Sequence, residues 1–225
     1  MSAAVTRFVR ALSAIELDHV FNPYSQRCAI HDRADAPMRR RRNLEITLCT
    51  AIEAQVDTIW IARDLGYRGG RRTGLALTDE VHLEKISDLY SGLPVRRATK
   101  GPAMAERTAR IIWQVLDRIA APVFLWNVFP LHPHEPGAPL SNRCHTAAER
   151  RECAWFLHEV LSLLQPAQVF AIGGDAHRAM AELGVGCTWV RHPSYGGQSQ
   201  FIQQIEMAYR LDPVTADLFM PRLSA

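Results

Sequence analysis

The chain has 225 residues, of which 48% are hydrophobic, and its formal net charge of +3 makes it only mildly basic. A chain of this size and composition is predicted to fold as a single domain, residues 1–225, around one sizeable core. All but two of the 26 cationic residues are arginines. Arginine suits bidentate phosphate contacts, although codon bias explains the excess equally well.

The sequence has five cysteines, an odd number, and they are widely spaced with no CxxC pair among them. They are Cys28, Cys49, Cys144, Cys153 and Cys187. This pattern argues against a disulfide framework or a zinc site, so we expect reduced thiols in a cytoplasmic protein that holds no metal. The apolar N-terminal segment carries arginine and acidic residues, which predicts an amphipathic helix rather than a secretory signal. No apolar run is long enough to span a membrane, and no membrane partner is expected.

Helical and extended patterns alternate along the chain. Helices are predicted at residues 4–20, 39–55, 80–90, 103–120, 146–164, 175–183 and 199–211, and strands at 56–62, 122–128, 168–173 and 187–191. Thr146 and Glu149 form a capping-box pattern at the start of the clearest helix. Because the strands are continuous apolar runs that alternate with helices, we predict a three-layer α/β/α fold around a central, mostly parallel four-stranded sheet.

Polar side chains collect in three loops that each follow a strand. These loops are residues 63–78, 127–145 and 191–198. In open α/β sheets, ligands bind beyond the carboxyl ends of the strands, so the three loops form one candidate site. They bring an acid, Asp64, an amide, Asn127, and an imidazole, His192, to the same sheet edge. Each of these residues alone can be explained structurally, as a turn cap or a packed loop residue. Their joint placement favours a functional site over that structural explanation.

The first of these loops, "ARDLGYRGGRRTG", sets one acid among glycines and arginines. The glycines indicate that something large approaches the backbone, and the arginines indicate that it carries negative charge. Two other features have plainer interpretations. The run Arg39–Arg42 either contacts phosphates or opens a charged helix. The pair His132 and His134 is expected in a solvated loop rather than at a metal.

Over residues 56–205, these motifs resemble the uracil-DNA glycosylase superfamily. "ARDLGYRGGRRTG" stands where that family has its first motif, "WN" resembles the end of its uracil-reading strand, and "VRHPS" resembles its last motif. "PLSNR" and the helix after it are also similar. The resemblance implies that Asp64 orients the attacking water, that Asn127 reads uracil, and that His192 stabilises the leaving base.

The resemblance implies a monomeric, cofactor-free enzyme that excises uracil from single- or double-stranded DNA and leaves an abasic site. It implies further substrate contacts from Gly66, Tyr67, Leu77 and Ser194. It implies DNA contacts from Arg68, Arg71, Arg72, Tyr195 and Gly196. The spacing of the cysteines argues against the iron–sulfur cluster that some branches of the family carry.

Three positions depart from the best-known branch of the family. Gly66 replaces the tyrosine that excludes thymine there, Leu77 replaces a base-stacking phenylalanine, and Tyr195 stands near the place of a wedge leucine. The resemblance therefore does not imply strict exclusion of thymine. Two other functions remain open: a hydrolase of free nucleosides or nucleotides, and a non-catalytic DNA-binding protein with the same fold.

Overall fold

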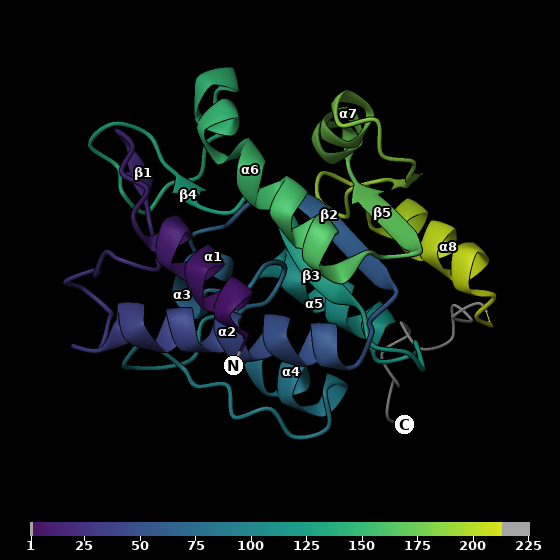
Figure 1. Ribbon diagram of the computed structural model, residues 1–225, viewed down its shortest axis with the longest axis horizontal. Helices are drawn as coiled ribbons and strands as arrows, with labels where there is room; N and C mark the ends of the chain where they lie inside the picture. Colours follow the sequence, from purple (N-terminus) through teal and green to yellow (C-terminus); the bar gives the residue numbers. More distant parts are fainter. Residues whose placement is uncertain (1, 213–225) are drawn as a thin grey trace, which may run out of the picture.

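A four-stranded parallel sheet forms the centre of the computed structural model, which describes residues 2–212 (Figure 1). Its strands are β2 (Thr58–Asp64), β3 (Phe124–Phe129), β5 (Gln168–Ile172) and β6 (Thr188–Val190), in the order β3-β2-β5-β6. Every neighbouring pair in this sheet is parallel. The fold predicted from the sequence is thus confirmed. Residues 1 and 213–225 of the predicted domain lie outside the described part of the chain.

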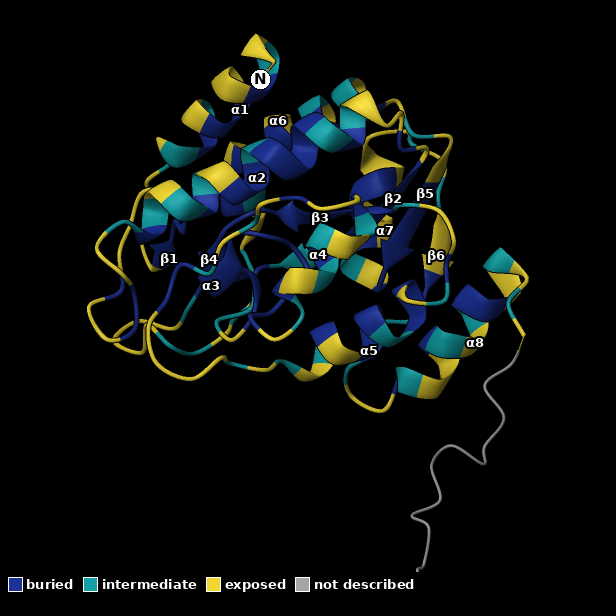
Figure 2. Cartoon of the chain, turned by 90° about the horizontal axis from the view of Figure 1, so that it is seen from below, coloured by how far each residue is buried: buried dark blue, intermediate teal, exposed yellow. Residues whose placement is uncertain are grey.

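Helices cover both faces of this sheet. They are α1 (Ala3–Ser13), α2 (Ala36–Glu53), α3 (Gly70–Thr73), α4 (Leu83–Leu89), α5 (Arg107–Leu116), α6 (Ala147–Leu164), α7 (Gly174–Glu182) and α8 (Gln198–Tyr209). Figure 2 shows α1, α2 and α6 on one side of the sheet and α5 and α8 on the other. The predicted capping box begins α6, because the Thr146 side chain accepts from the Glu149 N–H and the Glu149 carboxylate accepts from the Thr146 N–H.

Strand β2 ends in polar residues, because its buried apolar run stops at Ala62. Ile59, Trp60 and Ile61 of β2 are fully buried, whereas Asp64 at its carboxyl end is half-buried. The register pairs Asp64 with Phe129 of β3, so the two strands end side by side. The loops that follow β2, β5 and β6 therefore leave the sheet at one common edge.

Two elements differ from the sequence-based prediction. The first helix ends at Ser13 rather than near residue 20, because the Asn22 amide donates to the Leu12 and Ile15 carbonyl oxygens, at 2.8 and 3.0 Å. The chain then forms a small antiparallel pair, β1 (Val20–Phe21) with β4 (His132–Pro133). Strands of two residues are too short to leave a periodic signal in a sequence.

Segment 70–74, which contains α3, is held in place by hydrogen bonds from α2 and from the chain that precedes α2. Arg40 Nε donates to the Arg72 carbonyl at 3.0 Å, and Asn43 Nδ2 donates to the Thr73 carbonyl at 3.1 Å. The Tyr24 hydroxyl donates to the Gly74 carbonyl at 3.0 Å. Three side chains from outside the loop thus hold the backbone that follows Asp64.

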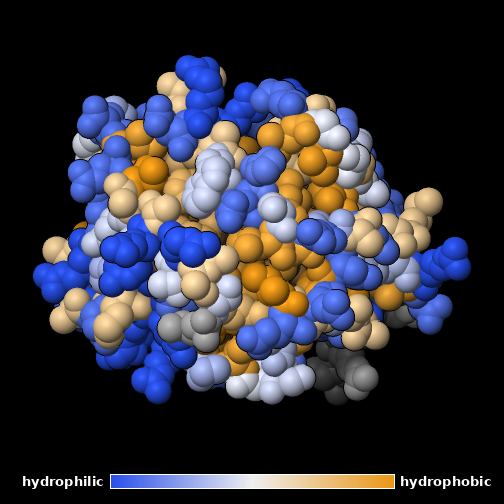
Figure 3. All heavy atoms as spheres, viewed as in Figure 1, coloured by the Kyte–Doolittle hydropathy of each residue, from blue (hydrophilic) through white to orange (hydrophobic). Residues whose placement is uncertain are grey.

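Trp113 lies in the core, whereas two other tryptophans do not. Trp155 and Trp189 remain 48% and 46% exposed. Figure 3 shows that hydrophobic residues reach the surface among hydrophilic ones on one face of the molecule. Within residues 2–212, none of the helices combines the length and the apolar character needed to cross a bilayer.

Candidate active site at the carboxyl edge of the sheet

A cavity of about 350 Å³ opens at the carboxyl ends of β2, β5 and β6. Six of the residues predicted from the sequence line it: Asp64, Gly66, Leu77, His192, Ser194 and Tyr195. They come from two loops that are far apart in the sequence and meet because their strands are parallel neighbours of β5. Half of the predicted site residues, including Asp64 and His192, thus share one cavity.

Asp64, the last residue of β2, is held on both carboxylate oxygens. Arg63 Nε donates to Oδ2 at 2.6 Å, and His145 Nδ1 hydrogen-bonds Oδ1. The His145 ring also lies 5.3 Å from the Phe129 ring, between centroids. A carboxylate with both oxygens occupied and its side chain mostly buried has a fixed direction.

His192 follows β6 and presents a neutral ring. Its Nδ1 accepts from the Ser194 backbone N–H at 3.1 Å and lies 2.7 Å from the Ser194 hydroxyl. Because a backbone N–H can only donate, Nδ1 carries no proton, and Nε2 bears the hydrogen. Burial, together with the charges of Arg63 and Arg191, lowers the pKa of His192 to about 4. The ring is thus a neutral hydrogen-bond donor over the working range of most enzymes.

Gly173, at the end of β5, makes room for this histidine. Its φ of +89° favours glycine, and a Cβ there would lie 3.2 Å from the His192 Cβ. Its N–H donates to the Val190 carbonyl at 2.8 Å. The close approach of the two loops therefore fixes where the imidazole lies.

Asn127 is 1% exposed, and its amide has no internal partner. Neither Oδ1 nor Nδ2 forms a hydrogen bond within the described part of the chain. Asn127 does not line the cavity, but Ala62, its register partner on β2, does. A buried amide left unpaired costs about 1–3 kcal/mol, so a position of this kind calls for an explanation such as a ligand.

Arg71 and Arg72, for which the resemblance implies DNA contacts, are both buried with internal partners. The Arg71 guanidinium lies 3.9 Å from the centre of the Phe21 ring, and its Nη1 lies 3.1 Å from His132 Nδ1. Arg72 Nε donates to the Glu80 carboxylate at 2.8 Å. Arg68 is exposed and stacks over the Tyr67 ring, so it alone of the three stays at the surface.

Replacing Arg72 with methionine is expected to lower the free energy of unfolding by about 1.5–3 kcal/mol, because it removes a hydrogen bond to the charged, buried Glu80. Equilibrium denaturation in urea measures this loss. The same variant should leave the salt dependence of DNA binding unchanged. Arg68→Met is the matched control, with little effect on stability. A stable Arg72→Met protein would contradict the internal role of Arg72.

The remaining predicted contacts lie at or beyond the cavity mouth. The Tyr67 N–H donates to Asn142 Oδ1 at 2.9 Å, and its hydroxyl accepts from Arg68 Nε at 2.6 Å. Tyr195 is 96% exposed, and both it and Gly196 have positive φ, at +49° and +78°. Tyr67 and Gly196 are not part of the cavity lining, whereas the Tyr195 side chain stands at its rim.

Several side chains in the cavity were missed from the sequence. Arg63, Glu106, Asn142 and Arg143 line it, and His145 touches Asp64. Asn142 lies in "PLSNR", a motif that is similar to the family's, so this residue had a signal in the sequence. His145 directly precedes the helix cap Thr146, and Glu106 directly precedes α5. Both therefore look like ordinary helix-start residues in a sequence.

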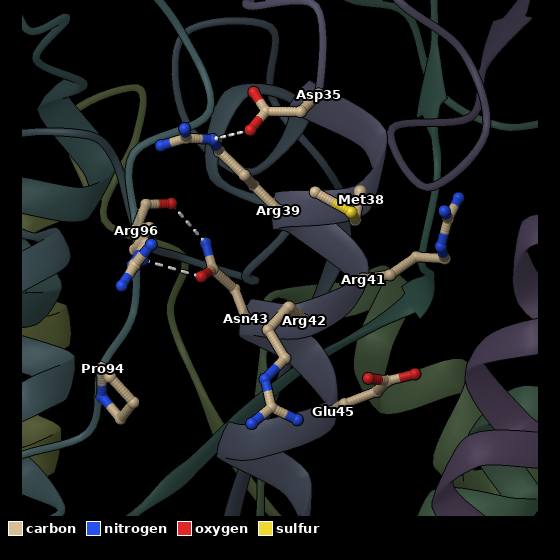
Figure 4. A pocket seen from close by; sticks show the side chains of 9 residues that line it. All are labelled: Asp35, Met38, Arg39, Arg41, Arg42, Asn43, Glu45, Pro94 and Arg96. Carbon is tan, nitrogen blue, oxygen red and sulfur yellow. Dashed lines mark hydrogen bonds and ion pairs between the residues drawn. The ribbon is translucent and has the colours of Figure 1, made fainter.

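A second hollow, of about 510 Å³, lies along the first turns of α2 and is lined by arginines. Figure 4 shows Arg39, Arg41, Arg42 and Arg96 around it, with Arg39 paired to Asp35. Arg40 of the same run is fully buried and paired with Asp32, its Nη1 donating to Oδ2 at 2.9 Å. The four consecutive arginines thus divide between the core and the surface.

His132 is buried, which corrects the expectation of a solvated histidine loop. Burial, together with the positive charge of Arg71, lowers its pKa to about 3. Its Nε2 lies 2.8 Å from the Ser141 carbonyl oxygen. Within the described residues, no group of three or more His, Cys, Asp or Glu side chains is placed to hold a metal ion.

A model of the uracil DNA glycosylase superfamily matches residues 71–209, which is more than half of the chain. The protein therefore belongs to the uracil-DNA glycosylase superfamily. Its structure is similar to the crystal structure of wild-type SMUG2 from Pedobacter heparinus, with a TM-score of 0.63 and 12% sequence identity, over 93% of this chain and 98% of that one. Among curated proteins, none matches the sequence.

Proposed function

We propose that this protein is a DNA glycosylase that hydrolyses the N-glycosidic bond of deoxyuridine in DNA, releasing uracil and leaving an abasic site. The observation that carries the proposal is the placement of Asp64 and His192, from different strands, on one cavity at the sheet edge. The family supports the class of enzyme. Such an enzyme acts on a nucleotide that is single-stranded or turned out of the duplex.

Asp64 acts on the sugar. As the bond between C1′ and the base nitrogen breaks, the sugar becomes cation-like, and a carboxylate held by Arg63 and His145 stabilises it. The same carboxylate orients a water molecule that adds to C1′ and accepts the proton which that water loses. A fixed carboxylate needs little reorganisation during the reaction, because its direction is set before the substrate binds.

His192 acts on the leaving base. Uracil departs with a negative charge that is shared with its carbonyl oxygens, and the Nε2–H of a neutral imidazole donates a hydrogen bond to one of them. Ser194 holds the ring in the tautomer that this requires. Removing a hydrogen-bond donor of this kind lowers transition-state stabilisation by about 2.7–4 kcal/mol in other enzymes.

Asn127 is the residue assigned to read the base, which must open a path to the buried amide beside the cavity-lining Ala62. Its amide offers an acceptor and donors, which match the N–H and carbonyl of the uracil edge, and no protein group competes for them in the described structure. Cytosine presents the opposite pattern and would leave these buried groups unpaired. A site built for such hydrogen bonds discriminates strongly.

The test is direct: the protein is incubated with single- and double-stranded oligonucleotides that contain one uracil, and abasic sites are measured by alkaline cleavage. The expected result is cleavage at the uracil and not at cytosine in the same context. Free deoxyuridine is the control. Cleavage of the nucleoside alone would indicate a nucleoside hydrolase, and DNA binding without base release would contradict catalysis.

Asn127→Asp is expected to slow uracil excision and to admit cytosine, because the carboxyl group replaces the amide donors. The loss on uracil is expected to be on the order of tenfold to a hundredfold, in line with one lost buried hydrogen bond pair. Single-turnover rates on uracil and cytosine oligonucleotides measure both effects. A variant with unchanged rate and base preference would remove Asn127 from the pocket.

A further inference from the structure

Glu106 brings a second carboxyl group into the cavity of Asp64 and His192. It directly precedes α5, and its backbone N–H donates to Asp79 Oδ2 at 2.6 Å, which fixes the backbone at this point. Its own carboxyl oxygens form no hydrogen bond or ion pair with any residue between 2 and 212. The group is therefore positioned by the protein and left available to a ligand.

Two glycines of the first loop leave space for this carboxyl group. A Cβ at Gly66 would lie 2.3 Å from Glu106 Oε1, and a Cβ at Gly69 would lie 2.2 Å from Oε2. A side chain at either position would displace the Glu106 carboxyl group, so the two glycines allow that group to lie where it does. These two glycines thus have an internal partner, whereas the sequence had suggested an approaching DNA backbone.

The charges around Glu106 oppose each other. Asp79 from the preceding loop faces it with like charge, and Arg68 faces it with opposite charge. Asp64, Arg63 and His192 share the cavity. Burial and the charge of Asp79 outweigh Arg68 and raise the pKa of Glu106 to about 7. Near neutral pH, a large share of the molecules therefore carries a proton on this carboxyl group.

Two other ionisable groups on the cavity, His192 and Asp175, do not offer such a proton. The pKa of His192 is lowered to about 4, so its ring donates a hydrogen bond without being an effective acid. Burial opposes the ionisation of Asp175, yet hydrogen bonds from Arg63 hold its pKa below the usual value. Asp64 is ion-paired with Arg63. Paired carboxyls whose environments differ divide the acid and base roles in many enzymes.

We propose that Glu106 is a catalytic residue that donates a proton to the leaving base, an inference that rests on the proposed glycosylase function. As the C1′–N bond breaks and its electron pair stays with the base, the Glu106 hydroxyl transfers its proton to a carbonyl oxygen or ring nitrogen of that base. The water that adds to C1′ gives one proton to Asp64. One water is consumed, the proton from Glu106 neutralises the negative charge that develops on the base beside His192, and solvent then exchanges the two protons.

This assignment extends the range of substrates. A base that leaves poorly as an anion, such as a purine with a carbonyl group, needs a proton more than uracil does. We therefore expect excision of such purines to depend on Glu106 more strongly than excision of uracil. The dependence follows from the acid alone, since His192 stabilises negative charge but does not remove it.

The test is the pH dependence of single-turnover excision by the wild-type protein and Glu106→Gln. The wild-type rate on uracil DNA should fall as pH rises through about 7, where Glu106 loses its proton. At pH 6 the variant should be slower than the wild-type protein, on the order of tenfold. This loss is smaller than the usual contribution of a general acid to the rate, because His192 already stabilises the anion. Its profile should be flat across the same interval, so the two curves converge above pH 8.

Glu84→Gln is the matched control, because Glu84 is an exposed carboxylate on α4 away from the cavity lining. It should keep the wild-type profile. If wild-type protein excises uracil and Glu106→Gln keeps both its rate and its pH profile, the inference is overturned while the proposed function stands. If the wild-type protein excises no uracil at any pH, the proposed function itself fails.

A second measurement needs no catalysis. Carboxyl ¹³C NMR of the wild-type protein, assigned with Glu106→Gln, follows the titration of Glu106 directly. We expect a midpoint near 7, and a shift in that midpoint when free uracil is added. A midpoint near the ordinary glutamate value of 4.5 would show that the proton is absent at neutral pH and would overturn the inference.

Discussion

Asp64→Asn should lower the single-turnover rate of uracil excision by about tenfold to a thousandfold, which corresponds to a few kcal/mol of transition-state stabilisation. Asparagine keeps the size of the side chain but loses the charge that stabilises the sugar cation and accepts a proton from water. Some activity should remain, because an amide can still orient the water molecule. Rapid mixing with excess enzyme measures the chemical step without product release.

A measurement of DNA binding distinguishes the loss of a catalytic carboxylate in Asp64→Asn from a folding defect. The variant should bind uracil-containing DNA at least as tightly as the wild-type protein, because a carboxylate near the phosphates is repelled by them. Fluorescence anisotropy at fixed salt gives the comparison. A wild-type rate in Asp64→Asn would mean that the carboxylate only fastens Arg63 and His145 at the end of β2.

His192→Ala should also lower the single-turnover rate by about tenfold to a thousandfold, because it removes the Nε2–H that stabilises the leaving anion. The loss should appear in the rate and not in the affinity for DNA, since the donor acts on charge that develops only as the bond breaks. Single-turnover kinetics over a range of enzyme concentrations give both values. An unchanged rate would remove His192 from the reaction.

Ser194→Ala is the control that tests the tautomer. It removes the hydroxyl that lies 2.7 Å from His192 Nδ1 but keeps the backbone N–H that fixes the proton on Nε2. Its effect should therefore be much smaller than that of His192→Ala. The double variant of Asp64→Asn and His192→Ala should lose less than the product of the single losses, because both groups act on one transition state.

The sheet and its helices were predictable because their signals are local. Continuous apolar runs such as the one around Trp60 have few alternatives to a buried parallel strand, and Thr146 with Glu149 defines a helix start within one turn. The positions of Asp64 and His192 at the sheet edge were predictable for the same reason, since Asp64 ends one strand and His192 lies two residues beyond another. Their joint position on one cavity needed only the parallel direction of the strands.

The contacts of the arginines and glycines were not predictable, because those contacts join segments that are distant in the sequence. Arg72 looks like a surface arginine until Glu80 and the buried position of the loop are known. The sequence shows that Gly66 and Gly69 leave space beside the backbone, but not that the Glu106 carboxyl group fills it. A sequence shows that such residues carry charge or lack a side chain, but the element that meets them lies elsewhere in the chain.

Gly70 lines the cavity, so the hydrogen bonds that hold segment 70–74 to Tyr24, Arg40 and Asn43 bear on how the proposed glycosylase would bind its substrate. A loop that is ordered before binding loses little conformational entropy when DNA arrives, whereas a mobile loop would lose about 1–2 kcal/mol per residue fixed. Most of the distortion in the complex is then borne by the nucleotide as it leaves the stack. We expect the enzyme to favour lesions whose stacking is already weak, such as uracil opposite guanine or in single strands.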